Sequence, residues 1–178
     1  MTDKIVQEHL ENLNVKAVMV TPSHPARTES AEFRKSKQRL KDDGHYKCFI
    51  CGRTDSIQIH HFAVEYSEQE LADMGKVKEF VETFDIYGYG KLLKNKKLES
   101  VEDCRCLMAI CAEHHTGTDS TNGGTSTSIH GIPFPYWIMQ KLAKDGLSPI
   151  PQEGFTVEMT EQKIKDFIDK EVLNEQVK

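Results

Sequence analysis

The sequence has no run of about eighteen apolar residues, the length that a helix needs to cross a membrane. Its first twenty residues also lack the basic start, the apolar stretch and the small-residue cleavage site of a secretory signal. We therefore expect a protein without a membrane segment that works in the cytoplasm. An excess of positive charge is missing too, because the net charge is −5 and the pI is about 5.9. Contact with nucleic acid would then depend on local basic patches or on a bound cation.

A disulfide framework is also not expected, although the chain contains five cysteines. Their number is odd and all of them lie between Cys48 and Cys111, which fits thiols kept reduced for metal binding. The chain has 178 residues, of which 38% are hydrophobic and 29% are charged. This length and composition predict one packed globular domain with additional helices.

Three segments of an α+β protein are predicted along the chain. Residues 1–45 contain a strand at Val15–Val20 and a basic helix that begins at Ser30 and is closed by Gly44. Residues 46–146 form the core, which includes a helical insertion. Residues 147–178 supply a linker and an amphipathic C-terminal helix. We expect the first segment to pack on the core.

The core segment alternates between helical and extended patterns. A capping box at Ser67–Glu70 predicts a helix with five buried apolar residues, Leu71, Met74, Val77, Val81 and Phe84. A short basic helix follows, and residues 104–110 predict a buried strand in which Cys104 and Cys106 share one face as structural thiols. Residues 116–128 form a small-residue loop, and Pro135 suits the first turn of a helix that ends at Gly146.

Two short motifs carry metal-ligand spacing. The stretch CFIC supplies Cys48 and Cys51, and the stretch CAEH supplies Cys111 and His114. Structural zinc takes four nitrogen or sulfur ligands, commonly as two pairs of this spacing, so these residues predict a Cys3His zinc site. The alternative is three small buried thiols beside an unrelated histidine. Gly52 directly after the first pair is typical of a zinc knuckle and favours the metal site.

Four further histidines lie near the expected zinc site in the sequence or the predicted fold: His60, His61, His115 and His130. His60 and His61 end a short predicted strand, and His115 directly follows the second ligand pair. Because adjacent residues of a strand face opposite sides, His60 and His61 need not share a role. One could bind a metal while the other accepts a proton from water.

The stretches CFIC, IHHF and LMAICAEHH together resemble the HNH endonucleases, also called the His-Me finger or ββα-metal family, in their zinc-stapled form. The fuller set, with HPARTESAEFR, IYGYG and IHGIPFPYWIMQKLAKDG, is similar to a group of bacteriophage HNH proteins over about residues 24–151. The resemblance implies a ββα core, DNA as substrate and, if the chain is phage-encoded, the host cytoplasm as location. It also implies that His61 is the general base, while His60 and His115 bind a catalytic divalent cation such as Mg²⁺.

One position departs from the family pattern. An asparagine usually lies five residues before the cysteine that opens the second ligand pair, and Cys106 stands there. Since a thiol cannot replace an amide as donor and acceptor, Arg105 or Asp103 substitutes, the base is held differently, or activity is weakened. The rival function is therefore a non-catalytic zinc module that binds DNA or a host protein.

The remaining site predictions concern His130 and the basic residues. His130 is either a further ligand of the catalytic cation or a loop histidine packed under Trp137. Candidate phosphate contacts are Arg27, Arg34, Lys35, Arg39, Lys94 and Lys97. A basic helix face is often merely solvated, and nothing in the pattern reads bases or separates DNA from RNA as the substrate.

Overall fold

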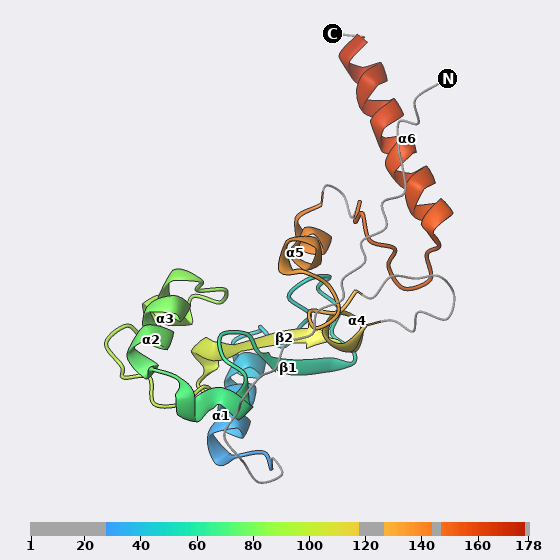
Figure 1. Ribbon diagram of the computed structural model, residues 1–178. Coiled ribbons are helices and arrows are strands. Elements are labelled where there is room, and N and C mark those ends of the chain that lie inside the picture. The colour runs from blue at the N-terminus through green and yellow to red at the C-terminus, as the bar shows by residue number, and fades with distance from the viewer. Residues whose placement is uncertain (1–27, 118–126, 144–146, 177–178) are drawn as a thin grey trace. The chain divides into compact units, whose positions relative to one another are not determined.

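The computed structural model describes residues 28–117, 127–143 and 147–176, and within them the chain has an α+β fold (Figure 1). A two-stranded antiparallel sheet is combined with helices, as the sequence predicts at the level of fold class. The predicted strand Val15–Val20 and the candidate contact Arg27 lie outside the described residues. Among the described helices, none is long and apolar enough to cross a membrane.

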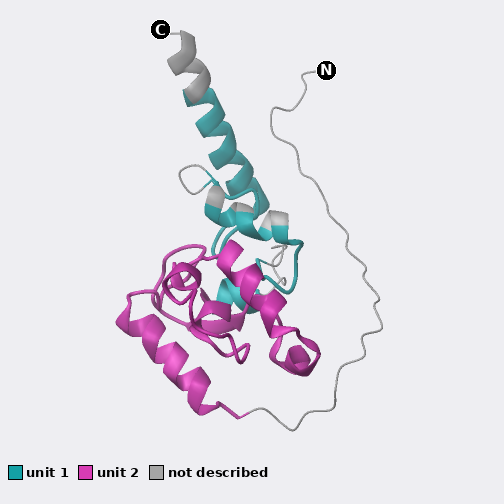
Figure 2. Ribbon diagram, turned by 90° about the vertical axis from the view of Figure 1, so that its left-hand side faces the viewer, with its two compact units in different colours: residues 1–15, 112–178 teal, residues 16–111 magenta. Residues whose placement is uncertain are grey.

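The chain divides into two compact units, which are coloured separately in Figure 2. One unit comprises residues 16–111 and holds the sheet. The other comprises residues 1–15 and 112–178, of which the described parts form three helices: α4 Ala112–Thr116, α5 Phe134–Leu142 and α6 Val157–Gln176. The two units meet in the chain at the end of the second strand.

The basic helix predicted after Ser30 is present as α1, Ala31–Asp42. The Ser30 hydroxyl accepts a hydrogen bond from the backbone N–H of Phe33 at 2.9 Å, which satisfies one of the unpaired donors of the first turn. After the helix Gly44 takes a φ of +74°, a left-handed conformation that glycine adopts without strain. Phe33 and Leu40 bury one side of α1, so the helix is fixed to the unit by its apolar stripe.

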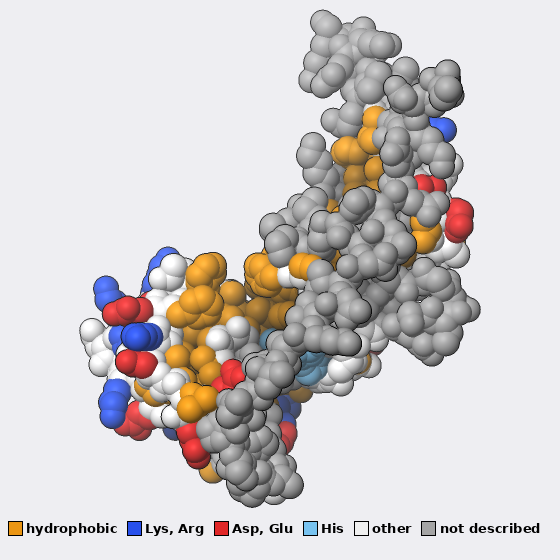
Figure 3. All heavy atoms as spheres, viewed as in Figure 1, with side chains coloured by type: hydrophobic (Ala, Val, Ile, Leu, Met, Phe, Trp, Pro, Cys, Tyr) orange, Lys and Arg blue, Asp and Glu red, His pale blue; other side chains and the backbone are white. Residues whose placement is uncertain are grey.

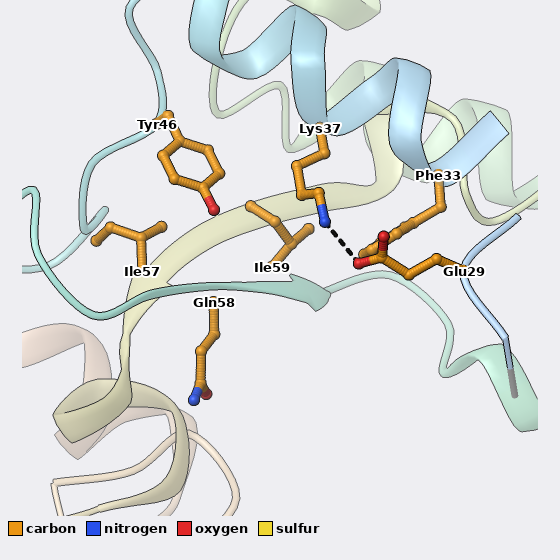
Figure 4. A pocket seen from close by; sticks show the side chains of 7 residues that line it. All are labelled: Glu29, Phe33, Lys37, Tyr46, Ile57, Gln58 and Ile59. Carbon is orange, nitrogen blue, oxygen red and sulfur yellow. Dashed lines mark hydrogen bonds and ion pairs between the residues drawn. The ribbon is translucent and has the colours of Figure 1, made fainter. Parts of the chain in front are cut away.

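The sheet pairs β1, Ile57–His61, with β2, Leu107–Cys111. Their antiparallel register sets His60 opposite Met108 and His61 opposite Leu107. Side chains alternate along β1: Figure 4 shows Ile57 and Ile59 toward Lys37 and Phe33 of α1, and Gln58 on the other side of the strand. Because the period of a strand is two residues, His61 belongs to the α1 side and His60 to the side of Gln58.

The predicted capping box at residues 67–70 is wrong. Residues Tyr66–Leu71 form a 3₁₀ helix, and the α-helix α2 runs only from Met74 to Thr83. The Asp73 carboxylate accepts hydrogen bonds from the N–H groups of Gly75 and Lys76, so it caps α2 in place of Ser67. Of the five apolar residues assigned to the core, Val77 and Val81 are buried and Met74 is half-buried. Leu71 and Phe84 are 65% and 56% exposed, so they do not belong to it.

Arg105 fixes the segment that leads into β2. This segment was predicted as part of the strand, but residues Cys104–Cys106 form a 3₁₀ turn and the strand begins at Leu107. The two cysteines are buried as expected, although their placement does not arise from strand alternation. The buried Arg105 guanidinium binds Asp103. It also donates to three backbone carbonyls that follow the helix α3, Tyr89–Leu92: those of Leu93, Lys96 and Lys97.

Within the unit of α4, α5 and α6, the single tryptophan organises the packing. Trp137 of α5 is fully buried, and its indole N–H donates to the carbonyl of His114 at 3.0 Å. The helix predicted near Pro135 is present as α5, and the predicted C-terminal helix is present as α6, which begins at Val157. The expected helix end at Gly146 and most of the small-residue loop lie outside the described residues.

Candidate metal centres

The first cysteine pair forms a tight turn that is bonded to β2. The backbone N–H of Gly52 donates to the carbonyl of Cys48 at 2.8 Å, and Gly52 itself has a φ of +76°. The N–H of Phe49 donates to the carbonyl of Ala109, also at 2.8 Å. This bond brings the Cys48–Cys51 turn beside the strand that ends in Cys111, so a local turn and one backbone contact position three thiols.

Cys48, Cys51, Cys111 and His114 form a four-residue cluster in which the candidate ligand atoms all lie within 4.8 Å of one another. The Sγ atoms of Cys51 and Cys111 are 4.0 Å apart. Three thiols and one imidazole form a donor set that zinc accepts in its usual tetrahedral arrangement. The cluster can hold a metal ion such as zinc, and the ligand set agrees with the pairing predicted from the sequence.

Burial affects the chemistry of this cluster. Partial desolvation of Cys51, together with the neighbouring thiols of Cys48 and Cys111, raises the pKa of its thiol to about 12. Without an ion the thiol is therefore protonated at neutral pH. A metal must displace that proton because the thiolate is the ligand, so binding and proton release are linked.

A second cluster consists of His60, His115 and His130, whose candidate ligand atoms also lie within 4.8 Å of one another. The rings of His115 and His130 have centroids 5.1 Å apart and are tilted by 47°. His60 is buried, His115 is half-buried and His130 is exposed. Desolvation, and then repulsion from His130, lowers the pKa of His115, which favours the neutral imidazole that a metal requires.

His61, predicted as the general base, lies on the other side of β1. Its ring stacks on Phe33 with a centroid distance of 5.6 Å and an interplanar angle of 18°. The ring of Tyr66 lies 6.1 Å away, and His61 is 5% exposed. The structure therefore brings His60, but not His61, into the histidine cluster.

Cys106 occupies an apolar site. It is fully buried and clusters with Val77, Val81 and Leu98, while Phe62 packs against the same group. Burial raises the pKa of its thiol to about 12, so the side chain is neutral. In this position the cysteine acts as a small hydrophobic residue.

Asp103 and Arg105, considered as substitutes for the asparagine, are engaged with each other. Nε of Arg105 lies 2.9 Å from Oδ1 of Asp103, and Nη2 lies 2.9 Å from Oδ2. These hydrogen bonds raise the pKa of Arg105. Both side chains thus have a structural task at the α3 segment.

The candidate phosphate contacts are mostly exposed, but several have acidic neighbours. Arg39 pairs with Asp43 at 3.4 Å, and Lys97 lies 3.7 Å from Glu99. Arg34 donates to the carbonyl of Glu29 at 2.6 Å, and Lys35 and Lys94 are exposed. On the face shown in Figure 3, basic and acidic side chains alternate over α2 and α3. That mixture gives no strong positive field, as the net charge predicts.

A hollow of about 350 Å³ lies between α1 and β1. Phe33, Tyr46, Ile57 and Ile59 line it, and the ion pair of Lys37 with Glu29, 2.5 Å long, crosses its rim (Figure 4). The hollow is on the His61 side of the strand and holds none of the clustered metal ligands.

Sequence reasoning missed Gln152. Its Oε1 atom lies 3.2 Å from Nε2 of His114, although the two residues are 38 positions apart. No short motif signals such a partner, because the contact depends on how the chain returns after α5. Comparison with models of protein families, with curated proteins and with solved structures gives no match for this chain.

Proposed function

We propose that the chain is a metal-dependent endonuclease of the HNH type that hydrolyses phosphodiester bonds in DNA. The observation that carries the proposal is the pair of clusters to which the two strands contribute Cys111 and His60. A Cys3His set suited to structural zinc ends at His114, and the next residue, His115, joins His60 and His130. Two paired strands, of which β2 is followed directly by the short helix α4, supply the elements that a ββα core requires.

In this proposal the Cys3His cluster is structural because all four tetrahedral positions are taken by the protein. The three-histidine cluster leaves positions open for water and substrate, as a catalytic centre must. A divalent ion bound there would neutralise charge on the scissile phosphate and on the leaving 3′-oxygen. His60, His115 and His130 would hold that ion with neutral nitrogens and would orient it at the end of β1.

The donor set narrows the choice of cation. Among the described residues, no carboxylate belongs to the three-histidine cluster. Imidazole nitrogen suits zinc, nickel, cobalt and other transition metals, whereas Mg²⁺ prefers oxygen ligands and retains several waters. We therefore expect Co²⁺, Ni²⁺ or Zn²⁺ to support activity better than Mg²⁺.

His61 remains the proposed general base, on the strength of the IHHF motif, since histidine is the side chain that most often takes this role. Its neutral ring would accept a proton from the attacking water. The stack on Phe33 orients the ring and limits its rotation. For this role the substrate must reach the His61 ring at the end of β1, where the loop after residue 61 begins.

A second candidate function is a zinc-stabilised module that binds DNA or a host protein without cutting it. The burial of His61 at 5% exposure and the apolar site of Cys106 favour this alternative. Both features fit a core in which packing has replaced the polar groups that position a base. The candidates differ in one measurable property, which is hydrolysis.

The deciding experiment is cleavage of supercoiled plasmid by the purified full chain with Co²⁺, Ni²⁺, Zn²⁺, Mn²⁺ or Mg²⁺. The enzyme proposal expects nicked and linear products that are lost in His60→Ala and in His61→Ala. His45→Ala is the matched control, because His45 stacks on Tyr87 and belongs to neither cluster. Equal cleavage by all three variants would mean a contaminating nuclease. Retention of DNA in a binding assay without cleavage under any cation would favour the second candidate.

A further inference from the structure

The side-chain amide of Gln152 is held in one orientation by three acceptors. Its Nε2 atom lies 2.8 Å from the carbonyl of Ile150, 3.1 Å from Oγ of Ser148 and 3.1 Å from Oε1 of Gln140. Only the NH₂ end of the amide can donate to these oxygens. The opposite end, Oε1, therefore faces His114.

Gln140 provides an independent check on this assignment. Its Nε2 atom donates to the carbonyls of Thr127 and Trp137, at 3.1 and 3.0 Å. The Gln140 amide is thus oriented with its oxygen toward Gln152, where it accepts the hydrogen bond that the first assignment requires. Reversing the Gln152 amide would place its oxygen against the acceptors Ile150 O and Gln140 Oε1. Reversing the Gln140 amide would place its NH₂ group against that of Gln152 and its oxygen against two carbonyls.

The oxygen of Gln152 lies 3.2 Å from Nε2 of His114. A carbonyl oxygen can only accept, so Nε2 of His114 must carry the hydrogen and Nδ1 must carry the lone pair. His114 is a member of the Cys3His cluster and is 1% exposed. We propose that Gln152 is a positioning residue that fixes the Nε2–H tautomer of His114 and presents Nδ1 to the metal.

The same contacts connect His114 to the segment that carries His130. The N–H of Ile129 donates to the carbonyl of His114 at 3.0 Å, and the Thr127 hydroxyl donates to the carbonyl of Glu113 at 2.9 Å. The amide chain from Gln152 through Gln140 ends on Thr127. Loss of Gln152 should therefore loosen the Cys3His centre and also the residues that precede His130.

This inference goes beyond the proposed nuclease function, because it concerns metal binding by the Cys3His cluster whether or not DNA is cut. Partners of this kind fix ring orientation and raise ligand basicity, and their removal typically costs 10–100-fold in metal affinity. We expect a loss in that range, about 10–100-fold, for zinc binding by Gln152→Ala. Gln152→Glu keeps an oxygen that accepts from Nε2–H, but its second oxygen faces the acceptors that now bind the amide NH₂. Its zinc affinity should therefore lie between those of Gln152→Ala and wild type.

The test combines a spectrum with an affinity. Long-range ¹H–¹⁵N spectra of zinc-loaded, histidine-labelled wild-type protein report which ring nitrogen of His114 is protonated, without any mutation. Zinc affinity is measured by competition with a chromophoric chelator for wild type, Q152A and Q152E. Gln162→Ala serves as the control, because Gln162 is an exposed residue of α6 that donates only to Asp166 among the bonds described for it.

The expected result is an Nε2–H tautomer, weakened zinc binding in Q152A, partial recovery in Q152E and wild-type affinity in Q162A. An Nδ1–H tautomer in the zinc-loaded wild type would overturn the proposal even if Q152A failed to fold. Zinc affinity of Q152A within threefold of wild type would overturn it as well. Equal losses in Q152A and Q152E would also count against the proposal, because an acceptor for Nε2–H would then bring no gain in zinc affinity.

Discussion

Removal of the Arg105 side-chain charge is the perturbation whose cost follows most directly from the structure. The side chain is 1% exposed and makes two hydrogen bonds to Asp103 and further bonds to the carbonyls of Lys96 and Lys97. In Arg105→Met the carboxylate of Asp103, which is 21% exposed, loses both hydrogen bonds from the guanidinium and keeps the one from the backbone N–H of residue 105, and these carbonyls lose their donors. Breaking a buried ion pair on one side costs about 3–5 kcal/mol.

The assay is equilibrium unfolding of the zinc-loaded protein in urea, followed by circular dichroism. For a chain of this length, about 1 kcal/mol corresponds to a shift of about 2–4 °C in Tm, so a thermal melt should fall by about 6–20 °C. Arg34→Met is the matched control, because Arg34 is exposed and has one described bond, to a backbone carbonyl. Its effect should stay within about 0.5 kcal/mol.

A loss below about 1 kcal/mol in Arg105→Met would refute this reasoning, because it would mean that the guanidinium contributes no more than an exposed ion pair. An equally large loss in Arg34→Met would also refute it, since burial would then not be the cause. The outcome bears on function too, because a structural Arg105 cannot orient a catalytic base.

Two further predictions concern the neighbours of Arg105. Cys106→Asn should lower stability in urea unfolding by about 1–3 kcal/mol, because it buries an amide among Val77, Val81 and Leu98; unchanged stability would show that the amide finds a partner there. Plasmid cleavage by this variant should rise or stay level if the asparagine argument holds, and a large fall would show a role for the thiol itself. Burial alone would raise the pKa of Asp103, but hydrogen bonds from Arg105 outweigh it and hold that pKa below its usual value. A carboxyl with a lowered folded-state pKa stabilises the fold above about pH 4 and loses that effect as the pH falls through the lowered value. Asp103→Asn should therefore have a lower unfolding free energy than wild type at pH 7, and this difference should shrink at about pH 3. A difference that stays constant with pH would contradict the assignment.

The elements that sequence reasoning predicted correctly depend on local chemistry. Ser30 caps α1 from three residues away, and the Cys48–Cys51 turn needs only a glycine at position 52 to close. The ligand pairs could be recognised because short spacings constrain the chain before it folds. Helical periodicity likewise located Val77 and Val81 in the core.

The errors arose where several residues could cap the same helix, or where contacts between residues distant in sequence determine burial and hydrogen bonding. Ser67 and Asp73 both suit a helix start, and only the folded chain shows that Asp73 receives the two N–H groups. Periodicity identifies a face of α2 but not what covers it, so Leu71 and Phe84 were assigned to the core although both are exposed. Gln152 could not be found, because its partner His114 is 38 positions away.

Metal content per chain tests the central claim most directly, because the account depends on two separate centres. Elemental analysis after dialysis, followed by titration with Co²⁺ or Mn²⁺, should give one tightly held zinc and one exchangeable ion. His115→Ala and His60→Ala should lose the exchangeable ion and keep the zinc, whereas Cys111→Ser should lose the zinc. A folded protein that contains no zinc, or a second ion that persists in both histidine variants, would contradict the account.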